Sequence, residues 1–382
     1  MVQQLLETQF NNFRGHRLQA LAEMEAITVT ELAKELDVSQ PGLSRIINGD
    51  LALSAELALR AANKFDLPIQ FFMVGPRIQE MVSVTWRKRA SSSSREDRKY
   101  TRLYDEAARL WREASRRSGY RTQNLPNPDQ YDNDVEDVAA AVRKLDGLDK
   151  NAPIRNMVRL AERLGIGVIT QLDPDCMDDS KHSGISRPTK YEDRPMVCCV
   201  PKLEGAAQRF TIAHELAHLI FDLDLPIQLK STDVQEKRAF EFAGALLAPQ
   251  CAMRKNIDEA TPISRFLRLK ATYGISIGAL VKRAASLGLI SRQRERSLHI
   301  QISSRGWRNH EPVEVPTETP QLLAQAAKIV WPENTASTAS KDTGVKAQQI
   351  AFWTGHPHPQ PRKNNVIPFH VPPENAGNSV IG

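Results

Sequence analysis

The chain has 382 residues, of which 41% are hydrophobic and 25% are charged, a composition typical of globular proteins and a length that suits two or three domains. No run approaches the ~18 consecutive apolar residues that a membrane-spanning helix needs, and residues 1–12 lack the basic flank and apolar core of a secretory signal. The four cysteines form no CxxC pair and are interpreted as reduced thiols. These features argue against a membrane protein and a disulfide-stabilised secreted domain, and they predict a cytoplasmic protein.

Charge is distributed unevenly behind the formal net charge of +6. Residues 1–70 carry 6 Lys/Arg against 9 Asp/Glu, whereas residues 77–122 carry 13 against 6 and residues 264–310 carry 10 against 1. Basic stretches bind phosphates or simply face solvent. Each basic segment is therefore a candidate for contact with an anionic partner, with a solvated surface as the alternative.

Residues 28–49 divide into two short helices. Thr28 and Glu31 form a capping box that starts the first helix. Ser39 is placed to cap the second helix, which Asn48-Gly49 ends. Two short helices joined by a tight turn predict a helix-turn-helix, in which the second helix enters the major groove of DNA with its N-terminal residues leading.

Polar residues near the start of this second helix are the candidate base or phosphate contacts: Ser39, Gln40, Ser44 and Arg45. Glutamine can read adenine and arginine can read guanine. The acidic balance of residues 1–70 favours a different interpretation, a small helical domain kept for protein contacts. The basic segment 95–121, Arg87-Lys88-Arg89 or dimerisation would have to supply the missing positive charge, so a homodimer is one of the expected possibilities.

The stretch from Arg17 to Phe72, which includes LAKELDVSQPGLSRIINGD, resembles the xenobiotic-response-element (XRE) family of phage-repressor-like domains. The resemblance implies a compact all-α DNA-binding domain, which we place at residues 14–73. Val29 stands where this family often has Gln, so one familiar phosphate contact is absent.

Beyond this domain the pattern first predicts a basic linker and helix over residues 74–134, with a polar run at Ser91–Ser94 and helical spacing over residues 96–118. Two amphipathic helices are expected at Val135–Leu145 and Ile154–Leu164.

Two short strands are expected after these helices, at residues 166–169 and 196–200, with a turn-rich stretch between them. Cys198 and Cys199 fall in the second strand and are interpreted as structural residues. In the turn-rich stretch, His182 and Tyr191 are weaker candidates for stabilising an oxyanion, and surface positions are the simpler interpretation of both.

The segment RFTIAHELAHLIF carries the strongest chemical signal. His214 and His218 lie four residues apart, so on a helix they share one face and can present two imidazoles to one ion. This is the two-histidine zinc-peptidase pattern, with Glu215 beside it as the candidate general base. Zinc held there would activate water and polarise the scissile carbonyl. Phe221 occupies the position where a metzincin has Gly, which argues against that class.

A third protein ligand is needed, and the next expected helix supplies candidates. Glu236 lies on its inward apolar stripe, where a carboxylate is costly without a partner such as zinc. Glu241 falls between the buried positions. Asp222 is four residues after His218 and could be a ligand or could orient a ligating histidine. We rank Glu236 first, and Asp222 and Glu241 remain as alternatives.

The two runs RFTIAHELAHLIF and EKRAFEFAGALLAP, with the helix-helix-strand pattern before them, resemble the ImmA/IrrE-type metallopeptidases over roughly residues 80–250. The resemblance implies a gluzincin-type zincin-like α+β fold, Zn²⁺ as cofactor, Glu236 as the third ligand and a narrow protein substrate, often a transcriptional repressor. Phe240 departs from the family, which commonly has Asn there.

The expected architecture is therefore α+β: the all-α helix-turn-helix domain, a zincin-like peptidase domain at residues 135–255, and a small basic C-terminal unit at 256–312. This last unit, expected to be helical or winged, resembles one that often follows these peptidases and could contact nucleic acid or dock the substrate. The Pro-, Asn-, Ser- and Thr-rich residues 313–382 are expected to form a disordered tail.

Two functions are compatible with this sequence. The first is a zinc endopeptidase that cleaves a specific repressor or related regulator while the helix-turn-helix binds DNA. The second is a non-proteolytic transcriptional regulator or antitoxin-like protein that uses the zincin domain as a sensor or scaffold. A full ligand set with Glu215 favours the first, because a scaffold does not need a general base. DNA and a protein substrate are the expected partners, and no membrane is.

Overall fold

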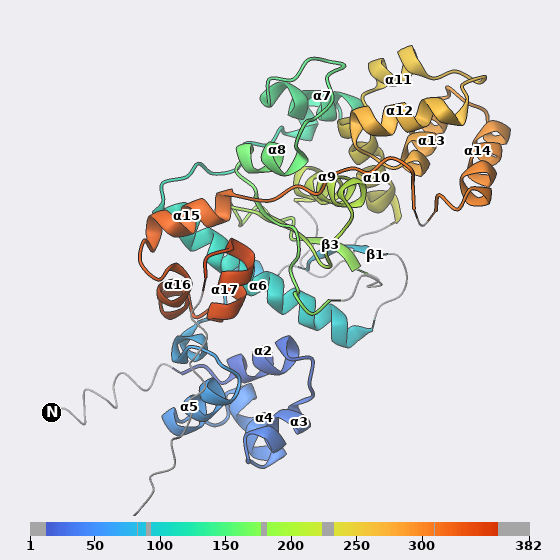
Figure 1. The fold of residues 1–382 in the computed structure, drawn as a ribbon. Coiled ribbons are helices and arrows are strands. Elements are labelled where there is room, and N and C mark those ends of the chain that lie inside the picture. The colour runs from blue at the N-terminus through green and yellow to red at the C-terminus, as the bar shows by residue number, and fades with distance from the viewer. Residues whose placement is uncertain are drawn as a thin grey trace, which may run out of the picture.

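The computed structural model describes residues 13–81, 83–88, 93–176, 182–223, 233–308 and 310–357 (Figure 1). A small sheet lies between two helical layers, and the helix-turn-helix domain extends from one end of the molecule (Figure 1). Among the described residues, no helix combines the length and the apolar character that a bilayer crossing requires. The expected α+β fold with an N-terminal all-α domain is confirmed.

The N-terminal domain consists of five short elements: α2 (His16–Met24), α3 (Val29–Glu35), α4 (Gln40–Asn48), α5 (Ala55–Lys64) and the 3-10 turn η1 (Ile69–Met73). The predicted capping box is present, since Thr28 Oγ1 accepts from the Glu31 amide at 3.1 Å and Glu31 Oε2 accepts from the Thr28 amide at 2.6 Å. Ser39 Oγ caps α4 by accepting from the Gly42 amide. Gly49 ends α4 with a φ of 87°, a left-handed conformation that suits glycine. The predicted helix-turn-helix is therefore formed.

The sheet has four strands in the order β1-β3-β4-β2. Their bounds are β1 (Thr85–Lys88), β2 (Gly167–Ile169), β3 (His182–Ser186) and β4 (Met196–Cys199). Strands β2 and β4 are parallel, whereas β3 is antiparallel to both of its neighbours. The two expected strands correspond to β2 and β4. The other two were not expected, because β1 is largely polar and β3, His-Ser-Gly-Ile-Ser, has a single apolar residue.

Each face of the sheet has its own apolar core. In β4, Val197 and Cys199 point into one core, while Met196 and Cys198 point into the other, as the two-residue period of a strand requires. The first core lies under five helices and a 3-10 turn that precede the basic unit: η3 (Pro128–Tyr131), α7 (Val135–Leu145), α8 (Met157–Arg163), α9 (Gly205–Phe221), α10 (Asp233–Leu247) and α11 (Gln250–Asn256). The second core lies under α6 (Ser94–Arg117) and joins the helix-turn-helix domain.

Helix α6 covers the second face of the sheet, so residues 74–134 are not a linker. Trp111 Nε1 donates to the Pro195 carbonyl at 3.1 Å, and the Tyr104 hydroxyl donates to the Met196 carbonyl at 2.9 Å. A Cβ at Gly167 would lie 2.8 Å from the Trp111 ring, so glycine allows the helix to approach β2 closely. The same stretch supplies the 3-10 turn η2 (Ile78–Met81) and the edge strand β1. Its basic composition obscured this packing, because α6 buries charged residues such as Glu106 and Arg109 together with its apolar ones.

The basic charge of α6 is paired with the acidic charge of the N-terminal domain. Arg102 Nε contacts Glu23 at 2.6 Å, and Arg95 contacts Glu31 at 3.0 Å. One ion pair has the opposite polarity, because Arg17 of the N-terminal domain contacts the buried Glu106 of α6 at 2.8 Å. These contacts give the first basic segment an intramolecular anionic partner.

The basic unit that follows is helical: α12 (Ile263–Tyr273), α13 (Ile277–Ser286) and α14 (Arg292–Ser304). Within its described residues there is no strand, so the winged alternative is wrong. Ile277, Leu280 and Leu298 belong to the same apolar core as Leu216 of α9. The unit is therefore packed onto the α9–α10 layer and shares its core.

The expectation of a disordered tail is wrong for the residues that form α15 (Leu322–Val330), α16 (Thr335–Thr343) and α17 (Ala347–Thr354). Leu323 and Trp331 are buried against α6 and its neighbours, and Trp353 Nε1 donates to the Leu172 carbonyl at 2.9 Å. Glu162 accepts from the amides of Gln321 and Leu322 at 2.7 Å each, which fixes the start of α15. Composition indicated disorder because the Pro-, Asn-, Ser- and Thr-rich sequence around them outweighs the short apolar runs of α15 and α17. Residues 358–382 lie outside the described part.

Candidate metal centre

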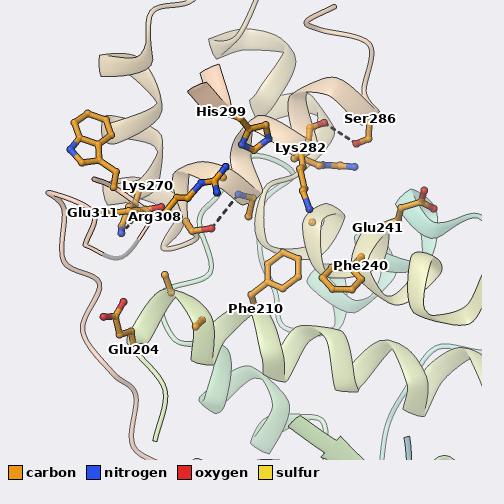
Figure 2. A pocket seen from close by; sticks show the side chains of 18 residues that line it. Glu204, Phe210, Phe240, Glu241, Lys270, Lys282, Ser286, His299, Arg308 and Glu311 are labelled. Carbon is orange, nitrogen blue, oxygen red and sulfur yellow. Dashed lines mark hydrogen bonds and ion pairs between the residues drawn. The ribbon is translucent and has the colours of Figure 1, made fainter. Parts of the chain in front are cut away.

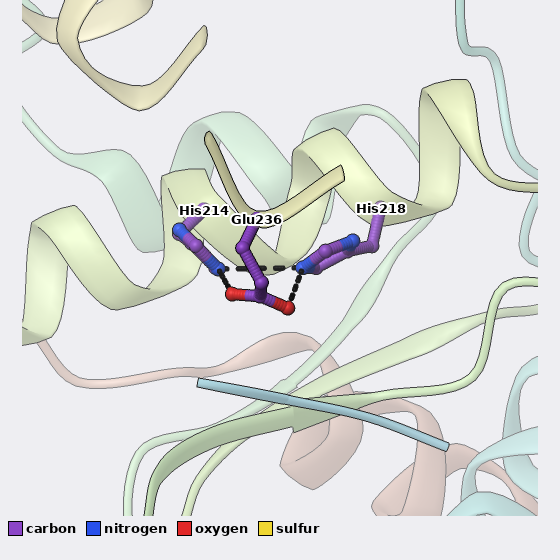
Figure 3. Close-up of side chains that lie close together, drawn as sticks. All are labelled: His214, His218 and Glu236. Atoms are coloured by element: carbon purple, nitrogen blue, oxygen red, sulfur yellow. Dashed lines mark hydrogen bonds and ion pairs between the residues drawn. The ribbon is translucent and has the colours of Figure 1, made fainter. Parts of the chain in front are cut away.

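Helix α9 carries the two histidines in the middle of the α-helical layer. Its length is almost entirely buried, which suits the apolar sequence around the motif. His214 and His218 are both fully buried, and their Nε2 atoms lie 3.3 Å apart (Figure 3). The four-residue spacing therefore places both imidazoles on one face, as predicted.

Glu236 reaches this pair from the first turns of α10. Its Oε2 lies 3.2 Å from His214 Nε2 and its Oε1 lies 3.5 Å from His218 Nε2 (Figure 3). The Glu236 side chain is 27% exposed, so the cluster is closed by α9 and open at the carboxylate. Within the described part of the chain, this is the group of side chains whose donor atoms come close enough together to hold a metal ion.

The donor set fits zinc in type and in spacing. Two imidazole nitrogens and a carboxylate oxygen are typical zinc ligands, and three protein ligands leave one position open. Ligand atoms about 2.1 Å from a tetrahedral ion are roughly 3.4 Å from one another. The two imidazole nitrogens lie 3.3 Å apart, and each lies 3.2 or 3.5 Å from a different oxygen of Glu236, so the three side chains are spaced closely enough for one ion.

Asp222 lies on the far side of His218. Its Oδ2 is 2.6 Å from His218 Nδ1, and Arg238 of α10 contacts its other oxygen. Burial lowers the pKa of His218, but the Asp222 hydrogen bond and the nearby carboxylates outweigh it and raise the pKa above its ordinary value. Asp222 therefore lies outside the cluster and in contact with a candidate histidine ligand, the arrangement expected of a residue that orients the histidine and not of a ligand. The other alternative ligand, Glu241, is exposed and faces Lys237 on the outside of α10.

Glu215 points from α9 to the sheet. Its Oε2 accepts from Ser186 Oγ of β3 at 2.7 Å and from Thr85 Oγ1 of β1 at 3.4 Å. A Cβ at Gly184 would lie 2.8 Å from Glu215 Oε1, so the carboxylate rests directly on the β3 backbone. Sequence reasoning missed Thr85, Gly184 and Ser186, because they sit on the two strands that the pattern did not predict.

The two weaker candidates lie elsewhere. His182 is buried in β3, so its surface interpretation is wrong. Its Nε2 is 2.7 Å from Asp97 Oδ1 and its ring meets Tyr100 edge to face. Both partners belong to α6, so His182 contacts the opposite helical layer from α9. Tyr191 is 47% exposed, which agrees with the surface interpretation.

Phe240, the residue that departs from the family pattern, contacts the cluster directly. Its ring meets the His214 imidazole edge to face with the centroids 4.7 Å apart, and it lies 5.9 Å from the Phe210 ring. The Phe210 and Phe240 rings therefore form an aromatic wall beside His214. Phe240 stands at the position where the resembled family commonly has Asn.

The four predicted DNA contacts lie together on α4 or at its cap. Ser39, Gln40 and Arg45 are exposed and Ser44 is half-buried. Gln40 Nε2 donates to Ser44 Oγ at 2.9 Å. Helix α4 packs on α2 and α3, and Figure 1 shows it at the end of the molecule away from α11–α14.

Comparison with known families divides the chain in the same way. Residues 18–72 match the helix-turn-helix family model, and residues 161–285 match a peptidase family model described as the IrrE N-terminal-like domain. No match was found among curated proteins. The chain thus joins a helix-turn-helix domain of the DNA-binding type to a domain of a metallopeptidase family, and both expected resemblances are confirmed. The peptidase match continues past residue 255 into α13, in keeping with the shared core.

Proposed function

We propose that this protein is a zinc-dependent endopeptidase that works at or near DNA. In this proposal, His214, His218 and Glu236 hold the zinc ion, and Glu215 is the general base. The observation that carries the proposal is the meeting of two imidazole nitrogens 3.3 Å apart with the Glu236 carboxylate, whose Oε2 and Oε1 lie 3.2 and 3.5 Å from His214 and His218 respectively. Glu215, a carboxylate that is not one of the three, is close enough to act on His218.

Zinc bound there would supply a Lewis acid that polarises the scissile carbonyl and activates water. Side chains of the protein would orient the ligands and transfer the proton. Asp222 fixes the ring of His218 so that Nε2 faces the cluster. Ser186 and Thr85 hold Glu215 in one orientation, in which it accepts a proton from water and passes it to the leaving amine.

The substrate that fits this architecture best is a DNA-associated regulator, such as a transcriptional repressor, in the cytoplasm. Helix α4 leaves Gln40 and Arg45 exposed for contact with base edges. A peptidase held on DNA in this way meets other proteins bound at the same region at high effective concentration.

The experiment compares cells that produce the wild-type chain with cells that produce Glu215→Gln, and it identifies new protein N-termini by mass spectrometry. The wild type is expected to create a small set of new protein N-termini that the variant lacks. Both purified proteins are expected to bind one zinc ion, so that loss of the metal does not explain the difference. Identical sets of termini in the two cultures would overturn the peptidase proposal.

The second candidate is a regulator that binds DNA without proteolysis. The observation that favours it is the rigid connection between the two parts, because the Arg17–Glu106 contact is buried and ties the helix-turn-helix domain to α6. Under this alternative, Arg45→Ala removes binding to the protein's own upstream DNA and changes transcription, while Glu215→Gln changes neither.

A further inference from the structure

A cavity lies on the outer side of the aromatic wall at His214. It encloses about 510 Å³ between the N-terminal half of α9, the outer face of α10 and helices α13 and α14 (Figure 2). None of the three candidate ligands lines it, and neither does Glu215. Its volume falls within the range of pockets that hold small molecules, about 300–1,000 Å³.

One wall of this pocket is apolar and includes two aromatic rings. Phe210 and Phe240 form its floor, and Figure 2 shows the two rings side by side below the open space. Ala207 and Ala279 extend the apolar surface. A Cβ added at Gly278 of α13 would meet no atom within 4 Å, so the pocket is open at this position. Such a wall suits a flat or aliphatic group.

The opposite wall carries positive charge without a matching acid. Among the described residues, no carboxylate lies within ion-pair distance of Lys282 or Arg308. The other two cations of the lining are neutralised, since Lys270 pairs with Glu311 at 2.6 Å and Arg283 pairs with a carboxylate of α7 at 2.5 Å.

His299 stands between these two cations. Burial lowers the pKa of His299, and although Glu295 opposes the shift, the charges of Lys282 and Arg308 lower the pKa further. Lys282 and Arg308 are therefore both close enough to the His299 imidazole to lower its pKa. Figure 2 shows all three side chains on the same side of the pocket, with Lys282 extending toward Phe210 and Phe240.

The acidic residues of the lining do not cancel this charge. Glu204 and Glu241 sit at opposite margins of the pocket (Figure 2), and Glu241 lies 3.8 Å from Lys237. The central space is thus bounded by aromatic rings below and by cations above, a combination that suits a ligand with an apolar body and an acidic group.

We propose that this pocket binds a small organic anion whose phosphate or carboxylate meets Lys282 and Arg308 and whose aromatic or aliphatic body lies on Phe210 and Phe240. The site is separate from the peptidase centre, but the two share the Phe240 ring. The chemistry is that of an aryl or alkyl phosphate or carboxylate.

Calorimetry with phenyl phosphate tests the proposal on the full-length protein. Wild type is expected to bind one molecule saturably, and about tenfold more tightly than it binds inorganic phosphate or phenol, each of which has half of the required chemistry. Lys282→Glu combined with Arg308→Glu is expected to weaken binding at least about tenfold.

Two further variants separate the pocket from general charge effects. Arg292→Glu combined with Arg296→Glu makes the same charge change on exposed positions of α14 outside the pocket and is expected to bind like wild type. A Cβ at Gly278 would meet no atom within 4 Å, so Gly278→Leu places an apolar side chain at the open edge of the pocket and is expected to abolish binding.

No saturable binding to wild type, or equal binding by wild type, the Lys282/Arg308 double variant and Gly278→Leu, would overturn the proposal. Phosphate captured by a metal would not depend on these positions. Glu215→Gln is expected to bind like wild type, so failure of the peptidase proposal would leave this result intact.

Discussion

At the scale of single residues, the candidate metal centre includes a side chain that is not one of the three candidate ligands. Asp222 is buried, accepts from His218 and is itself held by Arg238. A carboxylate in this position fixes the tautomer and orientation of a ligating histidine. The motif identified the two imidazoles from their spacing, but only the fold shows which nitrogen of His218 faces the cluster.

Asp222→Asn is expected to weaken zinc binding by about 10- to 100-fold, because the amide no longer orients the imidazole through a charged hydrogen bond. Competition with a chromophoric chelator measures this change. Glu241→Gln, an exposed acid of α10 outside the cluster, serves as the control and should keep the wild-type affinity. Equal affinities for wild type and Asp222→Asn would contradict the orienting role.

Gly184→Ala tests the close approach of Glu215 to β3. The added Cβ would lie 2.5 Å from Thr211 Cγ2 and 2.8 Å from Glu215 Oε1. Overpacking of this kind destabilises a fold by about 1–3 kcal/mol, which urea unfolding would detect. Gly278→Ala meets open space and should not destabilise. If both variants unfolded like wild type, the packing of Glu215 on β3 would be wrong.

At the scale of elements, the least expected feature is α6. Its sequence indicated a basic helix near a linker, yet it covers one face of the sheet and binds the N-terminal domain. Local pattern predicted the helix, because Leu103, Leu110 and Trp111 repeat at helical spacing. Its partners are strands and helices far away in the sequence, and no local signal identifies them. The same limit explains why β1 and β3 were missed.

The contact between α6 and the N-terminal domain predicts a dependence of stability on pH. Burial raises the pKa of Glu106, but the charges of Arg109 and Arg17 outweigh it and hold the pKa below its usual value. A lowered pKa in the folded state contributes stability above the unfolded pKa of about 4.3, and this contribution is lost as the pH falls through the folded value. The contact between α6 and the N-terminal domain should therefore become weaker in acid.

Glu106→Gln removes this contribution, leaves the buried Arg17 guanidinium without its carboxylate and leaves Arg109 with Glu80 at 3.6 Å. We expect a loss of about 3–5 kcal/mol at pH 7 and a flatter acid limb in urea unfolding followed from pH 7 to pH 3. The exposed Glu56→Gln serves as the control and should change little. An unchanged acid limb in Glu106→Gln would show that this carboxylate does not couple the two parts.

At the scale of the whole molecule, the C-terminal helices bind the parts together. Helix α16 packs on η1 of the N-terminal domain, where Gly344 lies close to Phe71. Helix α15 packs on α6 and β2. Composition could not show this, because α16 is rich in Thr, Ser and Ala, and the apolar residues of α15 and α17 are short runs within a polar stretch of sequence.

Ending the chain after residue 320 would remove α15–α17 and expose the α6 surface that they cover. Hydrogen exchange is expected to increase in α6 and in the N-terminal domain, while α9 and α10 keep their protection because their core lies on the other face of the sheet. Unchanged exchange in α6 would contradict the role of these helices.

The central claim is that one zinc ion is held by two imidazoles and a carboxylate from the next helix. The most direct test is the zinc content of purified wild type, Glu236→Ala and Glu241→Ala, measured by atomic emission after dialysis against a weak chelator. The account predicts one zinc ion per chain in wild type and in Glu241→Ala, and little or none in Glu236→Ala. Zinc retained equally by all three proteins would contradict it.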